Sequence, residues 1–572
     1  MAMQAAMRAF RPLLAAVAAV GALVAAGAAS AGSDGASRQY VVVYKQGADV
    51  AAAQAAIASA GGTIVSENRD IGVATVRSAD PSFQDKAAEQ GALEGAARDV
   101  SIGQAPQDAQ PKDAEIEKAT GDRLRAGKAK RRERGRGGGA IAPEPLASLQ
   151  WDMRMLGATP DGSYAVQQGS HAVRVGIIDT GIDGSHPDVA PNFDRELSRN
   201  FTIDDPVVDG PCEAEADQSC EDPADVDENG HGTHVASTIG SPINGLGIGG
   251  VAPKVDLVNL RAGQDSGYFF LGPTLDALTY AGDHGIDVVN MSFYIDPWLY
   301  NCAANPADSP AEQREQRLII SATQRAIDYA RAHGVTTVAA NGNENTDLGH
   351  PTSDPTSPDY PDPVNSPRER TVDNSCLSMP GEADGVIGVS SIGPSKTKAD
   401  FSNYGLEQTD VSAPGGYSRD FFGTPQYRTV QNLILAAFPE SVGRVEDRDG
   451  NGTPDIDADG NPTTPAVVKQ GDAYYQWIQG TSMAAPHAVG VAALIVAEYG
   501  RFDSRNGGLT LSPDRVEQIL RRTAVDTPCP NPATLDYPDR GPEYTATCEG
   551  NADLNGFYGD GIVNAFNAVT RR

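Results

Sequence analysis

The stretch QGTSMAAPHAVGVAALIVAEYG, residues 479–500, places one serine between a glycine and a long apolar segment. Ser is a favoured helix N-cap, so capping alone could account for Ser482. A hydroxyl at the start of a buried helix would also lie among N–H groups that favour developing negative charge. Gly480 permits a close approach of the backbone, and Pro486 falls in the first turn, where its missing N–H costs little. The rest of the chain has to decide between these interpretations.

Apolar, β-rich runs alternate with helical segments from about residue 145 onward. The runs are AVRVGIID, KVDLVNLRA, GIDVVNMSF, GVTTVAANG and DGVIGVSSIG. Continuous apolar strands separated by helices predict an α/β fold with a mainly parallel sheet covered by helices on both faces. Ligands bind beyond the carboxyl ends of the strands in such sheets, so the polar residues at those ends are the candidates for function.

Three further polar positions follow from this rule. Asp179 ends the first apolar strand, and Asn343 follows Gly342 at the end of another. His231 lies between two glycines in NGHGTHVAS, at a predicted helix start. A metal site at His231 and His234 is not expected, because the glutamate of an H-E-x-x-H motif is missing. A turn aspartate, a loop asparagine and a core histidine are the structural alternatives.

Together these motifs resemble the subtilisin-like serine peptidases, or subtilases. The flanking residues DTGID, HGTHVA, NGNEN and GTSMAAPH agree with that family, and so does the closing GDGIVNAF at residues 559–566. The chain order of carboxylate, histidine and serine is the one found in subtilisin. The resemblance covers about residues 145–572.

The resemblance implies a serine endopeptidase mechanism. Ser482 would attack the scissile carbonyl, and His231 would accept its proton and later protonate the leaving amine. Asp179 would orient His231, and Asn343 with the Ser482 amide would hold the oxyanion.

The resemblance also implies that substrate binds as an added strand along residues 290–294 and 339–342. The substrate-binding residues would then be Ser292, Phe293, Tyr294, Ala340 and Gly342. The family usually has Ser-Leu-Gly where this chain has Ser292, Phe293 and Tyr294. A tyrosine in place of glycine could narrow the groove, so the residue preferred before the scissile bond is left open.

Calcium is the expected cofactor. The segments GSHPDV and PINGLGIGGVAP resemble the calcium site of the family, which implies four ligands: Asp188, Asn244 and the carbonyls of Leu246 and Ile248.

A second calcium candidate is the insertion sequence DRDGNGTPDIDADGNP, residues 447–462. Asp447, Asp449, Asn451 and Asp455 match positions 1, 3, 5 and 9 of an EF-hand-like loop, but Ala458 stands where position 12 is normally glutamate. A solvated acidic loop without a metal is an equal alternative.

The N-terminus has the pattern of an export signal. Arg8 and Arg11 precede the apolar run PLLAAVAAVGALVAAGAA, and ASA at residues 29–31 fits cleavage before Gly32. A transmembrane anchor is the alternative, but the run is short and rich in Ala and Gly. We therefore predict a signal peptide over residues 1–31, a secreted, extracellular protein and no stable membrane anchor.

Strand and helix patterns follow the order βαββαβ over about residues 38–103. This unit, residues 32–104, resembles the inhibitor-like propeptide of the family, which implies an intramolecular inhibitor and a zymogen. Residues 105–144 have no apolar period and end in a basic, Gly-rich run, so we predict a flexible, protease-sensitive linker. The peptidase domain then spans residues 145–572, with an insertion at about 417–475. The exact maturation point stays open.

Six cysteines in an exported chain predict disulfides. Sequence does not settle their connectivity. Short loops favour the pairs Cys212 with Cys220 and Cys529 with Cys548, which leaves Cys302 with Cys376.

The 572-residue chain is 40% hydrophobic and carries a formal net charge of −31. An acidic surface disfavours nucleic acid and anionic membranes as partners and leaves cations possible. We expect a monomer that acts on protein or peptide substrates. A catalytically dead subtilase used for binding is the competing hypothesis. A serine esterase of the α/β-hydrolase class is disfavoured, since G-x-S-x-G and the order Ser, Asp, His are missing.

Overall fold

The computed structural model describes residues 37–99, 116–119, 124–127, 141–205, 208–210, 212, 219–359 and 367–571. The predicted signal peptide and much of the predicted linker lie outside these residues. Among the described helices, α9, Thr481–Tyr499, is long and apolar enough to cross a membrane. In its most apolar stretch, however, 89% is buried inside the protein, as in a core helix of a globular fold.

A seven-stranded sheet forms the centre of the large C-terminal part of the chain, in the order β15-β14-β10-β8-β5-β7-β6 with every neighbouring pair parallel. Five of the strands are the apolar runs of the sequence, and two short outer strands, β6 and β15, were not predicted. The strands in chain order are β5 Arg174–Ile178, β6 Arg199–Asn200, β7 Asp256–Arg261, β8 Val288–Met291, β10 Thr336–Ala340, β14 Ile387–Ile392 and β15 Val411–Pro414.

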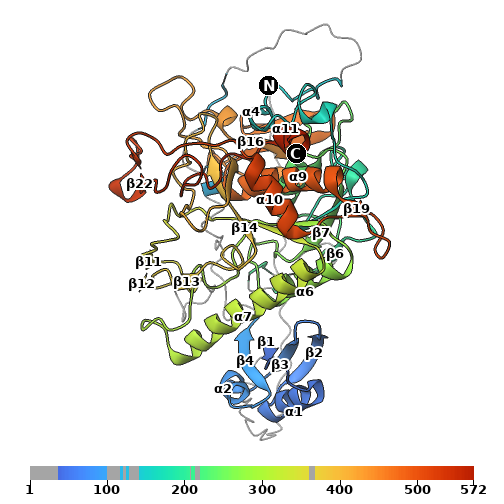
Figure 1. The fold of residues 1–572 in the computed structure, drawn as a ribbon, viewed down its shortest axis with the longest axis vertical. Helices are drawn as coiled ribbons and strands as arrows, with labels where there is room; N and C mark the ends of the chain where they lie inside the picture. Colours follow the sequence, from blue (N-terminus) through green and yellow to red (C-terminus); the bar gives the residue numbers. More distant parts are fainter. Residues whose placement is uncertain are drawn as a thin grey trace, which may run out of the picture. The chain divides into compact units, whose positions relative to one another are not determined.

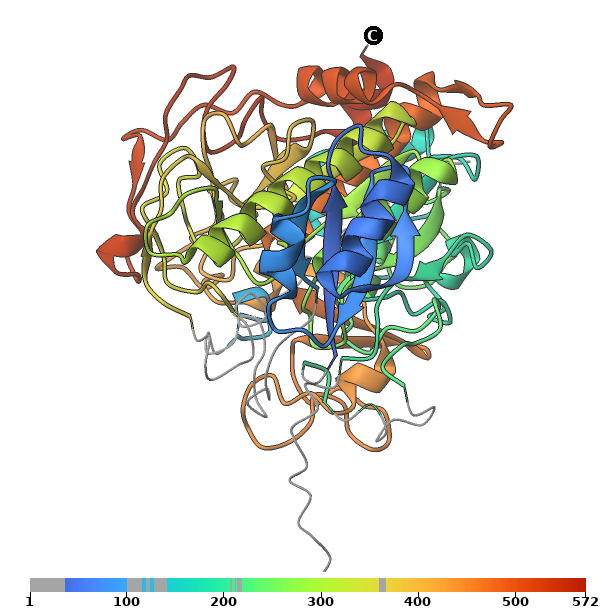
Figure 2. The same ribbon diagram turned by 90° about the horizontal axis from the view of Figure 1, so that it is seen from below.

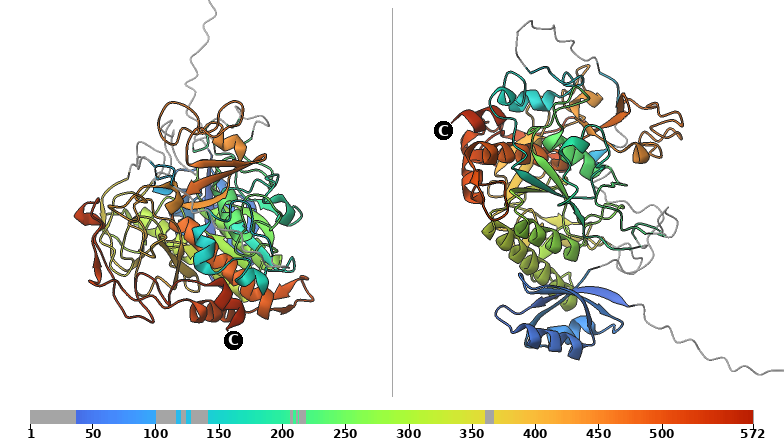
Figure 3. Two further views of the ribbon diagram at one scale, coloured as in Figure 1. Left: turned by 90° about the horizontal axis from the view of Figure 1, so that it is seen from above. Right: turned by 90° about the vertical axis from the view of Figure 1, so that its right-hand side faces the viewer.

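Helices cover both faces of this sheet, which confirms the predicted fold class. On one face, α9 packs on β8, β10, β14 and β15 and against α5, His231–Gly240, and α10, Pro513–Thr523. On the other face lie α6, Leu271–Asp283, and α7, Pro310–Ala332, as Figures 1 and 3 show. A capping box between Ser309 and Glu312 starts α7, because it satisfies backbone N–H groups that have no partner inside the helix.

The N-terminal unit has the predicted order βαββαβ. Its antiparallel sheet runs β2-β3-β1-β4, and one face forms a small core with the two helices around Val42, Ile57, Val76 and Phe83. The other face packs on α6 and α7 through residues such as Val43 (Figure 2). Its elements are β1 Arg38–Tyr44, α1 Val50–Ala60, β2 Thr63–Asn68, β3 Val73–Ser78, α2 Phe83–Ala88 and β4 Leu93–Arg98.

The predicted insertion contains a small antiparallel sheet of the order β16-β18-β17. It consists of β16 Ile434–Ala437, α8 Glu440–Gly443, β17 Val467–Gln470 and β18 Ala473–Ile478. The last strand, β18, leads through Gln479 and Gly480 directly into α9. The insertion is therefore connected covalently to the helix that carries Ser482.

Three disulfides are formed, and they are the three pairs favoured by the sequence: Cys212 with Cys220, Cys302 with Cys376, and Cys529 with Cys548. The second of them joins the short strands β9 Asn301–Cys302 and β13 Cys376–Leu377. The other short elements are α4 Trp151–Leu156, β11 Ser353–Asp354, β12 Arg370–Thr371, β19 Arg501–Phe502, β20 Leu509–Thr510, β21 Thr534–Leu535, β22 Ala546–Thr547 and α11 Ala565–Thr570, with single turns of 3-10 helix at Ser163–Ala165, Ala190–Asn192, Val430–Asn432 and Pro542–Tyr544.

Candidate active site

Asp179, His231 and Ser482 converge at one edge of the sheet. Asp179 directly follows β5, His231 is the first residue of α5, and Ser482 is the second residue of α9. Asp179 is fully buried, and its Oδ1 lies 2.7 Å from His231 Nδ1 and accepts the Thr180 N–H at 2.8 Å. The carboxylate therefore fixes one ring nitrogen of His231 and leaves Nε2 facing the cavity.

The electrostatic environment raises the pKa of His231. Burial lowers the pKa of its imidazole, but the negative charges of Asp179 and Glu117 outweigh burial and raise that pKa well above its usual range. Glu117 Oε1 lies 3.5 Å from His231 Nε2. An imidazole that holds its proton cannot accept another, so Glu117 opposes the general-base state of His231.

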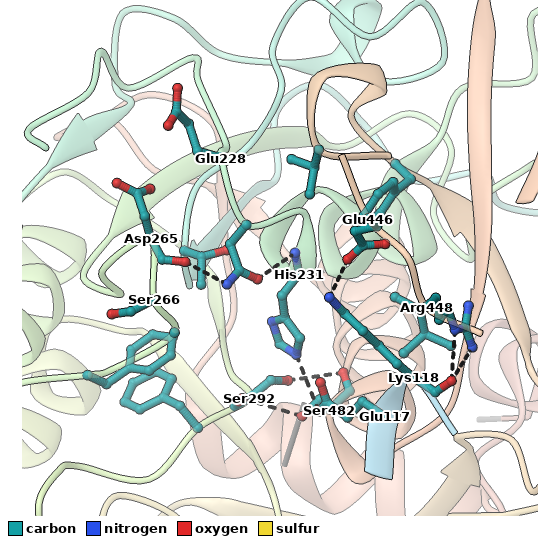
Figure 4. A pocket seen from close by; sticks show the side chains of 18 of the residues that line it. Glu117, Lys118, Glu228, His231, Asp265, Ser266, Ser292, Glu446, Arg448 and Ser482 are labelled. Carbon is teal, nitrogen blue, oxygen red and sulfur yellow. Dashed lines mark hydrogen bonds and ion pairs between the residues drawn. The ribbon is translucent and has the colours of Figure 1, made fainter. Parts of the chain in front are cut away.

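Ser482 is held by reciprocal contacts with Ser292. Its Oγ donates to the Ser292 carbonyl at 3.4 Å, and Ser292 Oγ donates to the Ser482 carbonyl at 3.1 Å. Among the described residues, no hydrogen bond joins Ser482 Oγ to His231. Figure 4 shows that Glu117 takes the position in front of His231 instead.

Asn343 is oriented by the residue before Ser482. Its Oδ1 accepts hydrogen bonds from the backbone N–H and the hydroxyl of Thr481, both at 2.9 Å. The amide nitrogen of Asn343 has no partner within the described chain and lines a small cavity beside Ser482. The side-chain carbonyl of Asn343 is therefore occupied by Thr481, and its side-chain NH2 group is available to donate to a ligand.

The predicted substrate-binding residues line two neighbouring cavities: the small one beside Ser482 and a larger one. A cavity of about 630 Å³ is lined by His231 and Ser482 together with Ser292, Phe293 and Tyr294. The smaller cavity beside it adds Ala340 and Gly342. The structure therefore brings all nine predicted catalytic and substrate-binding positions to one place: Asp179, His231, Ser292, Phe293, Tyr294, Ala340, Gly342, Asn343 and Ser482.

Tyr294 and Phe293 have specific partners in this groove. The Tyr294 hydroxyl donates to Asp359 Oδ2 at 2.7 Å, and its ring lines both cavities. Phe293 stacks on Phe269, with 4.1 Å between ring centroids. The tyrosine that replaces the glycine of the family is therefore a wall of the groove.

Several residues of the larger cavity were missed by sequence reasoning. Gly267 and Phe269 follow the end of β7, and the rule that sites form beyond strand ends could have found them. Glu446 and Arg448 lie in the insertion, and Glu117 lies in the predicted linker. Neither segment carries a periodic pattern or motif that points to the cavity.

The predicted linker is not wholly solvated. Glu117 and Ala119 are 8% and 6% exposed. Farther along the chain, Arg125 pairs with residues 428–430 through two backbone hydrogen bonds. Residues 116–119 and 124–127 gain their order from these contacts, since they have no core of their own.

The predicted calcium ligands around Asp188 form a hydrogen-bonded group. Asp188 is buried, and burial raises its pKa to about 7. Its carboxylate accepts from Asn244 Nδ2 at 3.2 Å, from the Ile248 N–H at 3.0 Å and from the Tyr475 hydroxyl at 3.1 Å, while Leu246 N–H donates to Asn244 Oδ1. Three donors contact this carboxylate, and the negative charge of Glu144, whose Oε2 is buried without a hydrogen-bond partner in the described chain, lies close by.

The insertion loop is the second calcium candidate. Asp455 is fully buried, and both of its carboxylate oxygens lack a hydrogen-bond partner. Burial, followed by the charge of Glu446, raises its pKa to about 7. Asp447 and Asp449 accept backbone N–H groups within the loop, including that of Asn451. An unpaired buried carboxylate beside oxygen-rich turns has the donor chemistry that calcium requires.

Within the described residues, two groups of side chains have potential ligand atoms close enough to share a metal, and neither includes the carboxylates of the insertion loop. Asp222, Glu228 and Asp265 lie together, but the Arg261 guanidinium already contacts two of these carboxylates. Asp204 lies beside Cys212 and Cys220, which form a disulfide. Neither group supports a metal site.

The fold and the site together define a serine hydrolase. A family model described as the subtilase family matches residues 170–561, and the chain belongs to that family as a serine-type endopeptidase. Subtilisin DY of Bacillus licheniformis is 26% identical over 354 residues, which make up 62% of this chain and 84% of that protein. The nisin leader peptide-processing serine protease NisP of Lactococcus lactis subsp. lactis is 28% identical over 361 residues, 61% of this chain and 44% of NisP.

Solved structures agree on the fold. The epidermin leader peptide processing serine protease EpiP from Staphylococcus aureus has a TM-score of 0.58 at 20% identity, covering 94% of this chain and 98% of that chain. Fervidolysin from Fervidobacterium pennivorans has a TM-score of 0.55 at 21% identity, covering 94% and 61%. The chain thus spans less than two thirds of the length of NisP and fervidolysin.

Proposed function

We propose that this chain is a secreted endopeptidase, made as a zymogen, that hydrolyses peptide bonds through Asp179, His231 and Ser482. The observation that carries the proposal is the buried contact of 2.7 Å between Asp179 Oδ1 and His231 Nδ1, with Ser482 in the same cavity. Secretion is supported by the N-terminal export pattern and by three disulfides, which persist in oxidising compartments.

The reaction proceeds through an acyl-enzyme. Ser482 Oγ attacks the scissile carbonyl while His231 Nε2 takes its proton, and His231 then gives that proton to the leaving amine. Water, activated by the same imidazole, hydrolyses the ester. Asn343 Nδ2 and the Ser482 N–H stabilise the oxyanion of each tetrahedral intermediate. The binding of the Asn343 carbonyl by Thr481 supports this role, because it directs the amide toward the cavity.

Protein or peptide substrate binds as an extended strand along residues 292–294 and 340–342. The position of these residues in the walls of the two cavities beside Ser482 supports this placement. Tyr294 restricts the groove where the family has glycine.

The N-terminal unit, residues 32–104, acts as the inhibitor of its own peptidase. Its contacts with α6 and α7 support this role. Arg98 forms an ion pair with Glu315 at 2.7 Å, and the Asp99 carboxylate accepts the Gly272 N–H at 2.6 Å near the start of α6. A carboxylate at a helix N-terminus is favoured by the helix dipole.

Calcium binds the insertion loop through Asp447, Asp449, Asn451 and Asp455 and stabilises it. The buried, unpaired Asp455 carboxylate supports this site. The ion would neutralise charge and order the loop.

Ser482→Ala tests the function directly, with the exposed Ser504→Ala as its matched control. Hydrolysis of casein and of peptides should fall by at least about 10⁴-fold in Ser482→Ala, because no other group can form the acyl-enzyme. Residual activity within tenfold of the wild type would refute the proposed mechanism. A dead, binding-only subtilase would show no hydrolysis even in the wild type.

A further inference from the structure

Residues 116–119 form a turn, in which the Ala119 N–H donates to the Ile116 carbonyl at 3.0 Å, and Glu117 and Lys118 of this turn line the catalytic cavity. Gln479, three residues before Ser482, donates its backbone N–H to the Glu117 carbonyl at 2.9 Å and its side-chain amide to the Ile116 carbonyl at 3.0 Å. The Gln479 side chain is itself fixed, since its Oε1 accepts the Ser418 N–H at 2.6 Å. Two successive carbonyls of the chain are therefore held by one residue.

This segment lies on the side of His231 opposite to the acyl side of the groove. Figure 4 shows Ser266 and Asp265 on one side of His231, and Lys118, Glu446 and Arg448 on the other. Asp99, the last described residue of the N-terminal unit, contacts Gly272 just beyond Phe269 on the acyl side. After residue 119 the chain runs on to Arg125, which pairs with residues 428–430. The contacts with Gln479, and the position of Lys118 across His231 from Ser266, assign residues 116–119 to the side where the leaving amine of a substrate lies.

Two charged groups of the insertion hold Lys118. Its ammonium forms an ion pair with Glu446 Oε1, and the other oxygen of Glu446 accepts from Gln476 Nε2 at 2.7 Å. Arg448 Nε and Nη2 donate to the Lys118 carbonyl, with the Nε contact at 2.8 Å. Arg448 is 9% exposed, so its guanidinium is fixed by the surrounding protein. The site therefore offers a peptide two fixed charged groups. The Glu446 carboxylate binds a basic side chain, and the Arg448 guanidinium donates to a backbone carbonyl.

We propose that Glu446, Arg448 and Gln479 form the leaving-group side of the substrate site, and that Glu446 selects a basic side chain at the position that Lys118 occupies. The preferred substrates are then peptides with lysine or arginine a few residues after the scissile bond. The predicted linker is the internal example of such a peptide, and the cut falls on the N-terminal side of Ile116. This inference rests on the proposed protease activity.

The test compares synthetic peptides that cover residues 108–123 and carry Lys, Ala or Glu at position 118. Each is hydrolysed by the purified enzyme as wild type, Glu446→Gln and Glu446→Lys. The exposed Asp472→Asn, which removes one negative charge elsewhere in the insertion, is the matched control. Because the comparison is the ratio of kcat/KM between peptides within one enzyme, differences in the amount of active protein cancel. Lys118→Glu enzyme is included to reveal competition by the internal segment.

The wild type should prefer the Lys peptide over the Glu peptide about tenfold, Glu446→Gln should bring the ratio to within about twofold of one, and Glu446→Lys should invert it. Mass spectrometry should place the cut before Ile116. A ratio unchanged by both Glu446 variants, or a cut after Ala119, would overturn the inference while the protease function stands. No hydrolysis of any peptide by the wild type would overturn the proposed function itself. Thermal unfolding in the Ser482→Ala background shows whether Glu446→Lys folds, and Glu446→Gln keeps the test decisive if it does not.

Discussion

The N-terminal unit and the 116–119 segment both contact the peptidase, but they gain their structures in different ways. The N-terminal unit has its own core around Val42 and Phe83 and adds a packed face against α6 and α7. The 116–119 segment has no core and is ordered by Gln479, Glu446 and Arg448. A folded unit can recognise a surface of helices, whereas a segment without a core has to occupy a groove.

The difference also separates two kinds of inhibition. The contacts of the N-terminal unit lie on α6 and α7, away from the side chains that would perform the chemistry. Glu117, in contrast, lies against His231 and favours the protonated imidazole. Removing contacts of the unit should change binding, whereas removing Glu117 should change proton transfer.

Among substitutions that leave the N-terminal unit and residues 116–119 unchanged, Asn343→Ala should have the largest effect on catalysis. We expect kcat to fall about 10²–10³-fold with KM nearly unchanged, because the oxyanion forms only on the way to the product. Steady-state kinetics on the processed enzyme measure this change. A rise in KM at constant kcat would instead mean that Asn343 binds the ground state.

Arg98→Ala should weaken inhibition by the N-terminal unit. When residues 32–104 are added to processed enzyme, we expect the inhibition constant to rise about tenfold or more, since the buried Glu315 carboxylate would lose the guanidinium of Arg98. Arg77→Ala, which removes an exposed arginine of the same unit, is the matched control. Equal inhibition by both variants would show that α7 is not the recognition surface.

Glu117→Gln should shift the pH dependence of self-cleavage. His231 must lose its proton to act as a base, so the rate rises with pH through its pKa. Asp179 and Glu117 both raise that pKa, and removing Glu117 lowers it. The rising limb should therefore move to lower pH in Glu117→Gln, and less so in Glu228→Gln, which lines the same cavity. An unchanged pH profile would contradict the contact between Glu117 and His231.

Calcium should have a smaller effect, on lifetime rather than on turnover. A ligand that binds only the folded state stabilises it by mass action, about 2.7 kcal/mol at a hundredfold excess over Kd. The autolysis half-life should shorten with chelator in the wild type and in Asp188→Asn. It should become insensitive to chelator in Asp455→Asn. If Asp188→Asn alone loses the calcium effect, the ion binds at the first predicted site instead.

Much of the peptidase fold could be predicted from the sequence because its signals are local. The apolar runs gave five strands of the central sheet, and residues at their ends, such as Asp179 and Asn343, lie in the site. The short strands β6 and β15 were missed because two- and four-residue strands carry little periodicity.

The contacts of Glu117 and Glu446 could not be predicted for a different reason. Nothing in the residues around them is periodic, and their positions depend on partners more than 300 residues away, as in the pair of Lys118 with Glu446. The calcium candidates illustrate the same limit. Sequence resemblance pointed to Asp188, but not to the donors that contact it or to the Glu144 carboxylate beside it, whose Oε2 has no hydrogen-bond partner among the described residues. Those contacts depend on the folded arrangement of Ile248 and Tyr475.

The central claim is that Ser482 is a nucleophile activated by His231, and covalent labelling with a fluorophosphonate probe tests it most directly. The processed wild-type enzyme should gain one probe adduct, located on Ser482 by mass spectrometry, with complete loss of peptide hydrolysis. Ser482→Ala should gain none, and His231→Ala should react far more slowly because the hydroxyl keeps its proton. Labelling of a different serine with equal loss of activity, or full hydrolysis by an unlabelled enzyme, would contradict the account.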